Sequence, residues 1–276
     1  MPELPEVETY ARYFARHALN QCIARVDVID ERILGEVRKE VFVRKLKGTT
    51  FQEVRRHGKH FFALATRNSQ PATRSATWLH LHFGMTGDLA YYRDIPPRFA
   101  KIVFTFDDKT HLAFEDMRLF GLADLVDSPD DFIRERGLGP DPLDRAFTPK
   151  RFAALLEGRR GAIKSLLMTQ EIIAGLGNLY VDETLYQTSI HPRRPVHRLK
   201  EAEVRAVFAA IRRILRESIA RQARDAELPR AYLFHHREVG ERCPLRLRSG
   251  QEPCGGTINR TVVFGRTTYF CAKHQR

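Results

Sequence analysis

The sequence predicts an α+β protein with several domains, and three observations carry this prediction. Strand-like segments dominate residues 22–126, helical periodicity dominates residues 150–223, and three of the four cysteines crowd into the last 36 residues. A chain of 276 residues is long enough for one large domain or two modest ones, each with its own core. Because 43% of the residues are hydrophobic, we expect a globular protein rather than a disordered one.

The first domain is assigned to residues 1–136 and is expected to be β-rich, with one helix at its start. Within residues 5–19 the apolar side chains recur at helical spacing. Apolar and polar residues alternate over 78–83, as in a strand with one buried face, and residues 101–114 read as a hairpin with its turn at 107–109. This half therefore begins with a helix and continues as strands.

Helices are expected after a linker at residues 137–149, where Gly and Pro interrupt regular structure. The second domain, residues 150–230, ends with a long helix over about 199–223. A Gly-Leu-Gly turn within 174–178 separates two shorter helices, and glycines of this kind let the backbone approach a neighbouring group closely. A third domain, residues 231–276, holds the cysteine-rich tail.

The charge balance favours a polyanionic partner. Lys and Arg number 46 against 34 Asp and Glu, a formal charge of +12, and the last 36 residues hold seven basic side chains against two acidic ones. Nucleic acid suits such an excess, although generic basicity is the alternative. No apolar run approaches bilayer length and the start is acidic, so we expect an intracellular protein with no membrane contact.

Pro2 and Glu3 are the first candidate catalytic residues. If the initiator Met is removed, Pro2 becomes a free secondary amine, and α-amino groups have a pKa of about 8 against about 10.4 for Lys. An unprotonated amine can attack an electrophilic carbon and form a Schiff base, and Glu3 is close enough to move protons. The alternative is that a Pro-Glu start only begins a helix, for which both residues are suited.

The tail carries a candidate metal site. Its spacing, Cys243-x10-Cys254-x16-Cys271-x2-His274, offers three thiolates and one imidazole, a ligand set of structural zinc sites. Because so short a segment cannot build a sufficient core, one bound zinc ion would supply the folding energy. The alternative is a surface hairpin with three unrelated cysteines. Cys22 is distant in sequence and is expected to be a packed thiol.

Two glycine-containing turns follow predicted strands of the first domain, at residues 83–87 and 116–121. They carry three large side chains, Met85, Arg118 and Phe120. Such residues ordinarily belong to a core or to a solvated surface. An enzyme that extrudes a base from a duplex, however, needs side chains of this kind to fill the vacated space.

In their order along the chain, these motifs resemble the formamidopyrimidine-DNA glycosylase family of DNA-repair enzymes. The resemblance covers almost the whole chain and is carried by residues 2–8, 58–59, 84–87, 116–121, 138–143, 163–164, 174–183, 190–192 and 265–271. It implies an N-terminal β-sandwich with flanking helices, a helix–two-turns–helix domain and a C-terminal β-hairpin zinc finger. Double-stranded damaged DNA would lie in a basic cleft between the halves. A monomer in the bacterial cytoplasm, associated with the nucleoid, is expected.

The resemblance also implies a reaction, that of a bifunctional glycosylase and AP lyase acting on formamidopyrimidines and 8-oxoguanine. Pro2 would attack C1′ of the damaged nucleoside, and Glu3 would protonate the sugar oxygen. The Schiff base then permits β- and δ-elimination at the abasic site. Lys59 and Arg266 join Glu3 among the proton-donating groups, with Lys59 also counted as catalytic, and Glu6 is a further acid of the site.

Contacts to DNA carry over in the same way. The DNA-binding positions are Lys59, Arg118, Lys164, Asn178 and Arg266. The void-filling positions are Met85, Arg118 and Phe120. The metal ligands are Cys243, Cys254, Cys271 and His274. Lys and Arg contacts to phosphates should supply most of the affinity and make it salt-dependent.

Two departures from the family pattern keep alternatives open. The family finger usually has two Cys-x2-Cys pairs, whereas here the first pair is stretched and His274 replaces a cysteine. Residues 221–230 are shorter than the loop that covers 8-oxoguanine in typical members, and they contain no Gly. Oxidised pyrimidines or abasic sites alone are therefore alternative substrates. A non-catalytic damage-binding protein is the alternative if Met1 is retained, and a zinc-stapled scaffold is a third class.

Overall fold

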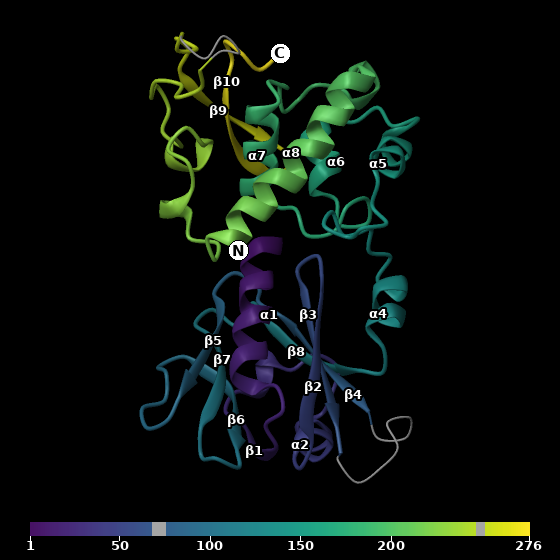
Figure 1. Cartoon of the computed structure of the whole chain (residues 1–276), viewed down its shortest axis with the longest axis vertical. Coiled ribbons are helices and arrows are strands. Elements are labelled where there is room, and N and C mark those ends of the chain that lie inside the picture. Colours follow the sequence, from purple (N-terminus) through teal and green to yellow (C-terminus); the bar gives the residue numbers. More distant parts are fainter. Residues whose placement is uncertain (68–75, 247–251) are drawn as a thin grey trace. The chain divides into compact units, whose positions relative to one another are not determined.

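Two compact units, residues 1–137 and 138–276, make up the protein in a computed structural model (Figure 1). The structure describes residues 1–67, 76–246 and 252–276. Among these residues, no helix combines the length and the apolar character needed to cross a bilayer. The first unit ends at the start of the predicted linker, while a separate domain for residues 231–276 stays a prediction.

The first unit contains two four-stranded antiparallel sheets, with strand orders β1-β6-β7-β5 and β2-β3-β4-β8. Its helices and strands are α1 (Leu4–Ala18), β1 (Ile23–Val28), α2 (Lys39–Leu46), β2 (Thr50–His57), β3 (His60–Thr66), β4 (Thr77–His82), β5 (Gly87–Tyr92), β6 (Ala100–Phe106), β7 (His111–Asp116), β8 (Leu122–Val126) and α4 (Pro129–Glu135). The predicted hairpin at 101–114 is confirmed as β6 and β7, which pair directly.

One apolar core joins the two sheets, which confirms the predicted sandwich. Phe51 of β2 meets Phe104 of β6 at a ring-centroid distance of 5.7 Å, so the inner faces of both sheets share this core. The predicted first helix is also confirmed as α1. Its Phe14 is fully buried, with ring centroids 4.9 Å from Phe51 and 4.8 Å from Phe61. The start of the chain is therefore anchored to the sandwich by its most buried face.

Helix α2 interrupts the strand-rich residues 22–126 and is not predicted by the sequence pattern. This helix is only eight residues long and buries Phe42 and Leu46, too few positions to establish a helical period. Helix α4 was missed as well, although Ser128 caps its first turn by accepting a hydrogen bond from the Asp131 N–H.

The expected alternation along β4 is also wrong in detail. Leu79, His80 and Leu81 are all buried, so both faces of the strand are covered. Phe132 of α4 lies 4.4 Å from the His80 ring and covers the second face. The alternating pattern predicts that His80 faces solvent, whereas the structure packs it beneath α4.

The second unit is helical and ends in a β-hairpin. Its elements are α5 (Pro149–Leu156), α6 (Ile163–Met168), α7 (Asn178–Gln187), α8 (Glu201–Ala220), β9 (Ile258–Val263) and β10 (Arg266–Cys271). Helix α7 is largely buried because it packs against both α8 and β10 (Figure 1). Residues 138–148 form no regular element but are hydrogen-bonded to this unit, for example from the Gly139 N–H to the Gln170 carbonyl at 2.8 Å.

Candidate functional site

Pro2 and Glu3 lie at the beginning of α1, the end of the helix that carries the positive partial charge. Glu3 is the N-cap residue and is only 3% exposed. Its backbone N–H donates to Oε2 of Glu6 at 2.8 Å, so the helix itself orders this acid. The two interpretations of the Pro-Glu start are thus compatible, because a helix that begins here holds both groups in place.

Lys59 occupies the tight turn between β2 and β3 and is 7% exposed. The turn needs Gly58, whose φ of 56° falls in the left-handed region that favours glycine. Arg56 pairs with Glu8 of α1 at 2.9 Å and donates to the Gly58 carbonyl at 3.2 Å. One guanidinium therefore connects the helix that bears Pro2 to the turn that bears Lys59.

The two glycine-containing turns of the first unit pack backbone against backbone. A Cβ on Gly84 would lie 2.2 Å from the carbonyl carbon of Phe120, so no larger residue fits there. The Arg118 N–H donates to Oγ1 of Thr86 at 3.2 Å across the contact. Turns that are about thirty residues apart in sequence are thereby held as one surface.

Asp116 organises this surface, and the sequence analysis assigned it no role. It is fully buried and accepts hydrogen bonds from the Thr86 hydroxyl and from the N–H groups of Arg118 and Gly121, the last at 2.6 Å. Burial alone would raise the pKa of Asp116, but these hydrogen bonds hold it below its ordinary value. The sequence signal for this role is an acidic residue at the end of a predicted strand, directly before a turn.

The three predicted void-filling residues are gathered on the surface that Asp116 organises. Met85 is 44% exposed and Phe120 is 53% exposed, which is unusual for large apolar side chains beside a glycine turn. The Arg118 guanidinium lies 4.7 Å from the centroid of the Phe120 ring. The surface thus presents two apolar side chains and one stacked cation to an external ligand.

In the second unit, Lys164 is fully buried in a polar network that joins α6, α7 and β10. Its Nζ donates to Oδ1 of Asn178 at 2.7 Å, to Oδ1 of Asp182 at 2.6 Å and to Oγ1 of Thr268 at 2.7 Å. Asn178 in turn donates to the Thr267 carbonyl at 3.0 Å. The network therefore fixes Asn178 at the beginning of α7 with its side chain partly exposed.

Two acids of α7 support this arrangement, and neither received a role from the sequence. Asp182 follows Asn178 by four residues, so both lie on one face of the helix, and it also binds Arg237 at 3.0 Å. Glu183 is buried, and burial raises its pKa to about 7. Its carboxylate accepts from the Phe234 N–H at 3.2 Å. Arg266 is exposed at the first position of β10.

The four predicted metal ligands converge, and their ligand atoms all lie within 4.8 Å of one another. Cys254 and Cys271 have Sγ atoms 3.7 Å apart, while Nδ1 of His274 lies 3.4 Å from Cys254 Sγ and 3.6 Å from Cys243 Sγ. A tetrahedral zinc ion requires about 3.8 Å between sulfurs and about 3.6 Å between sulfur and nitrogen. The donor set therefore fits zinc despite the stretched first pair.

Surrounding groups prepare these ligands for a metal. His274 Nε2 lies 3.1 Å from the Tyr186 carbonyl, which can only accept, so Nε2 carries the proton and Nδ1 presents its lone pair. A Cβ on Gly256 would lie 2.6 Å from Cys271 Sγ, so glycine is required for the chain to pass this close. Free thiols at this separation, with an oriented imidazole, form a closed site of the structural type.

Comparison with known proteins agrees with both units. Residues 1–123 match the model of the formamidopyrimidine-DNA glycosylase N-terminal domain, and residues 138–228 match that of the formamidopyrimidine-DNA glycosylase H2TH domain. Two curated formamidopyrimidine-DNA glycosylases are similar over nearly their full lengths. The Acidiphilium cryptum protein is 36% identical with 100% of both chains covered, and the Paracoccus denitrificans protein is 35% identical with 98% of both covered.

Solved structures extend the similarity to three dimensions. Lactococcus lactis formamidopyrimidine-DNA glycosylase bound non-covalently to DNA with an AP site matches with a TM-score of 0.83 and 27% identity, covering 99% of both chains. The wild-type protein with DNA containing N7-benzyl-Fapy-dG also gives a TM-score of 0.83, with 100% of both chains covered. With its sandwich, H2TH helices and cysteine-histidine hairpin, the present chain belongs to the formamidopyrimidine-DNA glycosylase family.

Proposed function

We propose that this enzyme, a base-excision-repair DNA glycosylase with AP lyase activity, removes oxidised bases through a Schiff base on Pro2. The observation that carries the proposal is the pairing of Pro2 with a buried acid, Glu3, at the ordered start of α1. An amine of low pKa is the right nucleophile, and a neighbouring acid is needed because the intermediate requires repeated proton transfers. Removal of Met1 is a condition of this role, since only then does Pro2 carry a free amine.

In the proposed reaction the Pro2 nitrogen forms a bond to C1′ while the N-glycosidic bond breaks and its electron pair leaves with the base, which takes up the proton that the Pro2 nitrogen loses. Glu3 protonates the sugar-ring oxygen, the ring opens, and the Pro2 nitrogen becomes an iminium. The iminium acidifies the C2′ proton, so β-elimination breaks the 3′ C–O bond and δ-elimination then breaks the 5′ one. Hydrolysis of the Schiff base returns Pro2. Lys59, Arg266 and Glu6 are assigned to proton transfer around these steps.

For DNA binding we assign phosphate contacts to Lys59, Asn178 and Arg266, and void filling to Met85, Arg118 and Phe120. The exposure of Met85 and Phe120 supports the second assignment, because exposed apolar side chains lose little when they enter a vacated base stack. Lys164 is buried, so its proposed part in DNA binding is indirect: it orients Asn178 by a 2.7 Å hydrogen bond. The Lactococcus lactis structures with damaged DNA support a double-stranded damaged duplex as the partner.

The metal proposed for the cysteine-histidine site is one structural zinc ion. Cys243, Cys254, Cys271 and His274 would hold it, and the four-ligand set leaves no open position for chemistry. When bound, zinc supplies folding energy to the hairpin that carries Arg266. The proposed zinc ion takes no part in the reaction, which depends on Pro2, Glu3 and the residues assigned to proton transfer.

Borohydride trapping tests the reaction. Wild-type protein incubated with a duplex containing an abasic site should form a covalent adduct on reduction, and intact mass should show that Met1 is absent. Pro2→Gly should lose at least about a hundredfold in trapping, and Glu3→Gln should do the same while still binding the duplex. A Tyr92→Phe protein serves as a matched control outside the site. Undiminished trapping by Pro2→Gly would refute the assignment of the nucleophile.

A second substrate class is supported by residues 221–230, which are too short to form the family's covering loop. Oxidised pyrimidines or abasic sites alone would not need that loop. Single-lesion duplexes carrying 8-oxoguanine, a formamidopyrimidine, an oxidised pyrimidine or an abasic site separate the classes by their single-turnover rates. A rate for 8-oxoguanine below about one hundredth of the rate for oxidised pyrimidines would favour the second class.

A further inference from the structure

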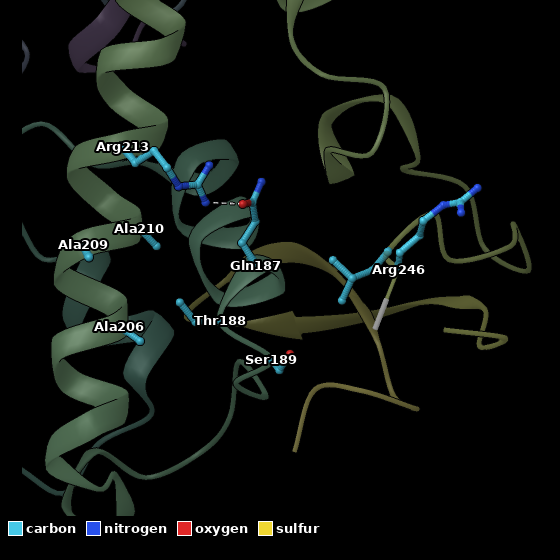
Figure 2. A pocket seen from close by; sticks show the side chains of 9 residues that line it. Gln187, Thr188, Ser189, Ala206, Ala209, Ala210, Arg213 and Arg246 are labelled. Atoms are coloured by element: carbon cyan, nitrogen blue, oxygen red, sulfur yellow. Dashed lines mark hydrogen bonds between the residues drawn. The ribbon is translucent and has the colours of Figure 1, made fainter. Parts of the chain in front are cut away.

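A groove follows the exposed side of α8 in the second unit. It consists of two hollows of about 460 Å³ and about 600 Å³ that share Ala209 and Arg213 in their walls. The first hollow is bordered by residues 187–189 at the C-terminal end of α7, and Figure 2 shows Arg213 above its alanine-lined floor. None of the roles assigned above uses this groove.

Positive charge accumulates along the groove beyond what the chain neutralises. Five arginines line it, namely Arg205, Arg212, Arg213, Arg216 and Arg246. Two of them are paired, Arg205 with Glu201 and Arg213 with Glu217. For the other three, no ion pair is recorded with any residue that the structure describes. The carboxylates of Asp141 and Asp144 act on Arg212, so the uncompensated charge of the groove lies on the exposed Arg216 and Arg246.

Arg212 shows the consequence of this crowding. Its Nη1 is held by the carbonyls of Pro142 and Asp144, each at 2.9 Å, which are dipoles rather than opposite charges. Burial lowers the pKa of Arg212 and the neighbouring charge of Arg216 lowers it further, while the carboxylates of Asp141 and Asp144 offset part of this effect. A bound anion would relieve this repulsion, so the groove favours a negatively charged occupant.

The floor between these charges is apolar and made of small or flat side chains. Ala206 and Ala209 leave the helix surface low, and Leu245 closes one wall. The Phe208 ring lies 5.6 Å beneath the Arg212 guanidinium. The lining is thus cationic at its edges and apolar at its base, which suits a ligand that carries both carboxylates and apolar side chains.

The groove is separate from the residues assigned to DNA within the same unit. Asn178 stands at the first position of α7, whereas Gln187 is its last residue and residues 188–189 follow it. At about 1.5 Å of rise per residue, the two ends of this helix lie roughly 15 Å apart. A ligand in the groove therefore need not compete with a duplex held at Asn178.

We propose that this groove docks an acidic segment of a partner protein, with apolar side chains spaced between its carboxylates. Acidic side chains would reach the exposed guanidiniums of Arg216 and Arg246, and the apolar ones would enter the two hollows over Ala209. A phosphodiester strand is the less suitable occupant, because it offers charge but no small apolar groups for the hollows.

Fluorescence anisotropy with a labelled synthetic peptide tests the proposal on the full-length, zinc-loaded protein. The probe repeats Asp-Asp-Leu, and two companion peptides replace every Asp by Asn or every Leu by Ser. Saturable binding of the first peptide is expected, with each companion weakened at least about tenfold because charge and apolar contacts are both required. Equal binding of the Leu-to-Ser peptide would overturn the proposal, since charge alone would then explain the attraction.

Three variants locate the binding. Ala209→Glu puts a carboxylate on the shared wall, and the double variant Arg205→Glu/Arg216→Glu reverses two exposed charges. Each should weaken the peptide at least about tenfold while abasic-site nicking stays at the wild-type level, which also shows that the variant is folded. Arg198→Glu, an exposed arginine outside the groove, is the matched control and should change binding less than about twofold. Groove variants that bind like this control would refute the assignment.

A competition with DNA completes the test. Protein saturated with a short duplex containing a stable abasic-site analogue should still bind the peptide with its affinity changed less than about threefold. If the duplex displaces the peptide, and Ala209→Glu weakens duplex binding in parallel, the groove is a nucleic-acid surface and the proposal is wrong.

Discussion

The sandwich of the first unit and the hairpin that ends the second unit are stabilised by different means. At least 24 described residues form the apolar core of the sandwich, with eight phenylalanines among them. The cluster beneath the hairpin holds six buried residues, and three of these are cysteines. Burial of apolar surface stabilises the first region, whereas the second buries much less of it, and the proposed zinc ion would supply the stabilisation that is lacking.

The comparison also explains where polar groups are buried. In the sandwich, buried polar side chains such as Asp116 shape the turns at its surface. In the second unit, the fully buried Lys164–Asp182 pair connects helices to the hairpin. A buried pair contributes little net stability compared with apolar residues of the same volume, but it fixes geometry. Buried polar contacts therefore fix the positions of Lys164 and Asn178 in the second unit, and the proposed zinc ion would fix the hairpin in the same way.

The largest expected effect comes from removing a proposed metal ligand, which should destabilise the hairpin and leave the sandwich intact. Cys254→Ala should reduce bound zinc from one equivalent to below about half and expose the amides of β9 and β10 to hydrogen exchange, because structural zinc supplies roughly 10–16 kcal/mol in small fingers. Metal analysis and exchange mass spectrometry give both readouts. Cys22→Ala, in the first unit, is the control and should retain zinc. Full zinc in Cys254→Ala would contradict the ligand assignment.

A cavity in the core of the sandwich should destabilise the first unit and leave zinc binding unchanged. Phe14→Ala removes a fully buried ring that touches Phe51 and Phe61, and it should lower the free energy of unfolding of the first unit by about 3–5 kcal/mol. Urea unfolding followed by fluorescence of Trp78, the chain's single tryptophan, reports on this unit. Zinc content should not change. Loss of zinc in Phe14→Ala would show that the two regions are not independently stabilised.

A smaller effect is expected from acid, again on the sandwich. Burial lowers the pKa of His60 to about 2 and that of His80 to about 3, with neighbouring His82 lowering both further. Their ordinary value is 6.5, so below that pH the unfolded chain binds protons that the folded chain does not. Stability should therefore fall by about 2–3 kcal/mol between about pH 7 and about pH 5.5, above the range in which most carboxylates titrate.

Urea unfolding across this pH range, read by Trp78, measures the slope. His80→Phe keeps a flat ring against Phe132 and removes both a titrating group and the unpartnered Nδ1, so the pH dependence should shrink by about half. His111→Gln, on β7 in the other sheet, is the matched control. An unchanged slope in His80→Phe would mean that other groups cause the acid sensitivity.

The smallest effect should come from an exposed ion pair, which tests whether surface charge matters in the better-packed unit. Arg12 pairs with Glu8 one turn away on α1 at 3.0 Å. Arg12→Ala should cost about 0.3–0.5 kcal/mol in the same urea assay, because solvent screens the pair. Arg56 also binds Glu8 but is 9% exposed, so Arg56→Ala should cost more. Equal costs for the two variants would contradict the role given to burial.

Periodicity and spacing were sufficient for the elements whose signals are local. The first helix, the β6–β7 hairpin and the Cys3His set that converges in the structure could all be named from the sequence, because each depends on residues close together or on a rare residue type. Helices α2 and α4 could not, since eight and seven residues give too short a pattern for a helical period. The burial of His80 could not be predicted either, because it depends on a helix that begins 49 residues later.

The sequence by itself determined the family, and it named the candidates Pro2 and Glu3, the proposed void-filling residues and the Cys3His set, since these rest on residue types in a fixed order. Only the tertiary structure decided what holds them. It connects Glu8 through Arg56 to the turn before Lys59, places Asp116 beneath two turns, and buries Lys164 between Asp182 and Thr268. The physical reason is that contacts between distant segments depend on which surfaces the hydrophobic core brings together, and no local pattern encodes that choice.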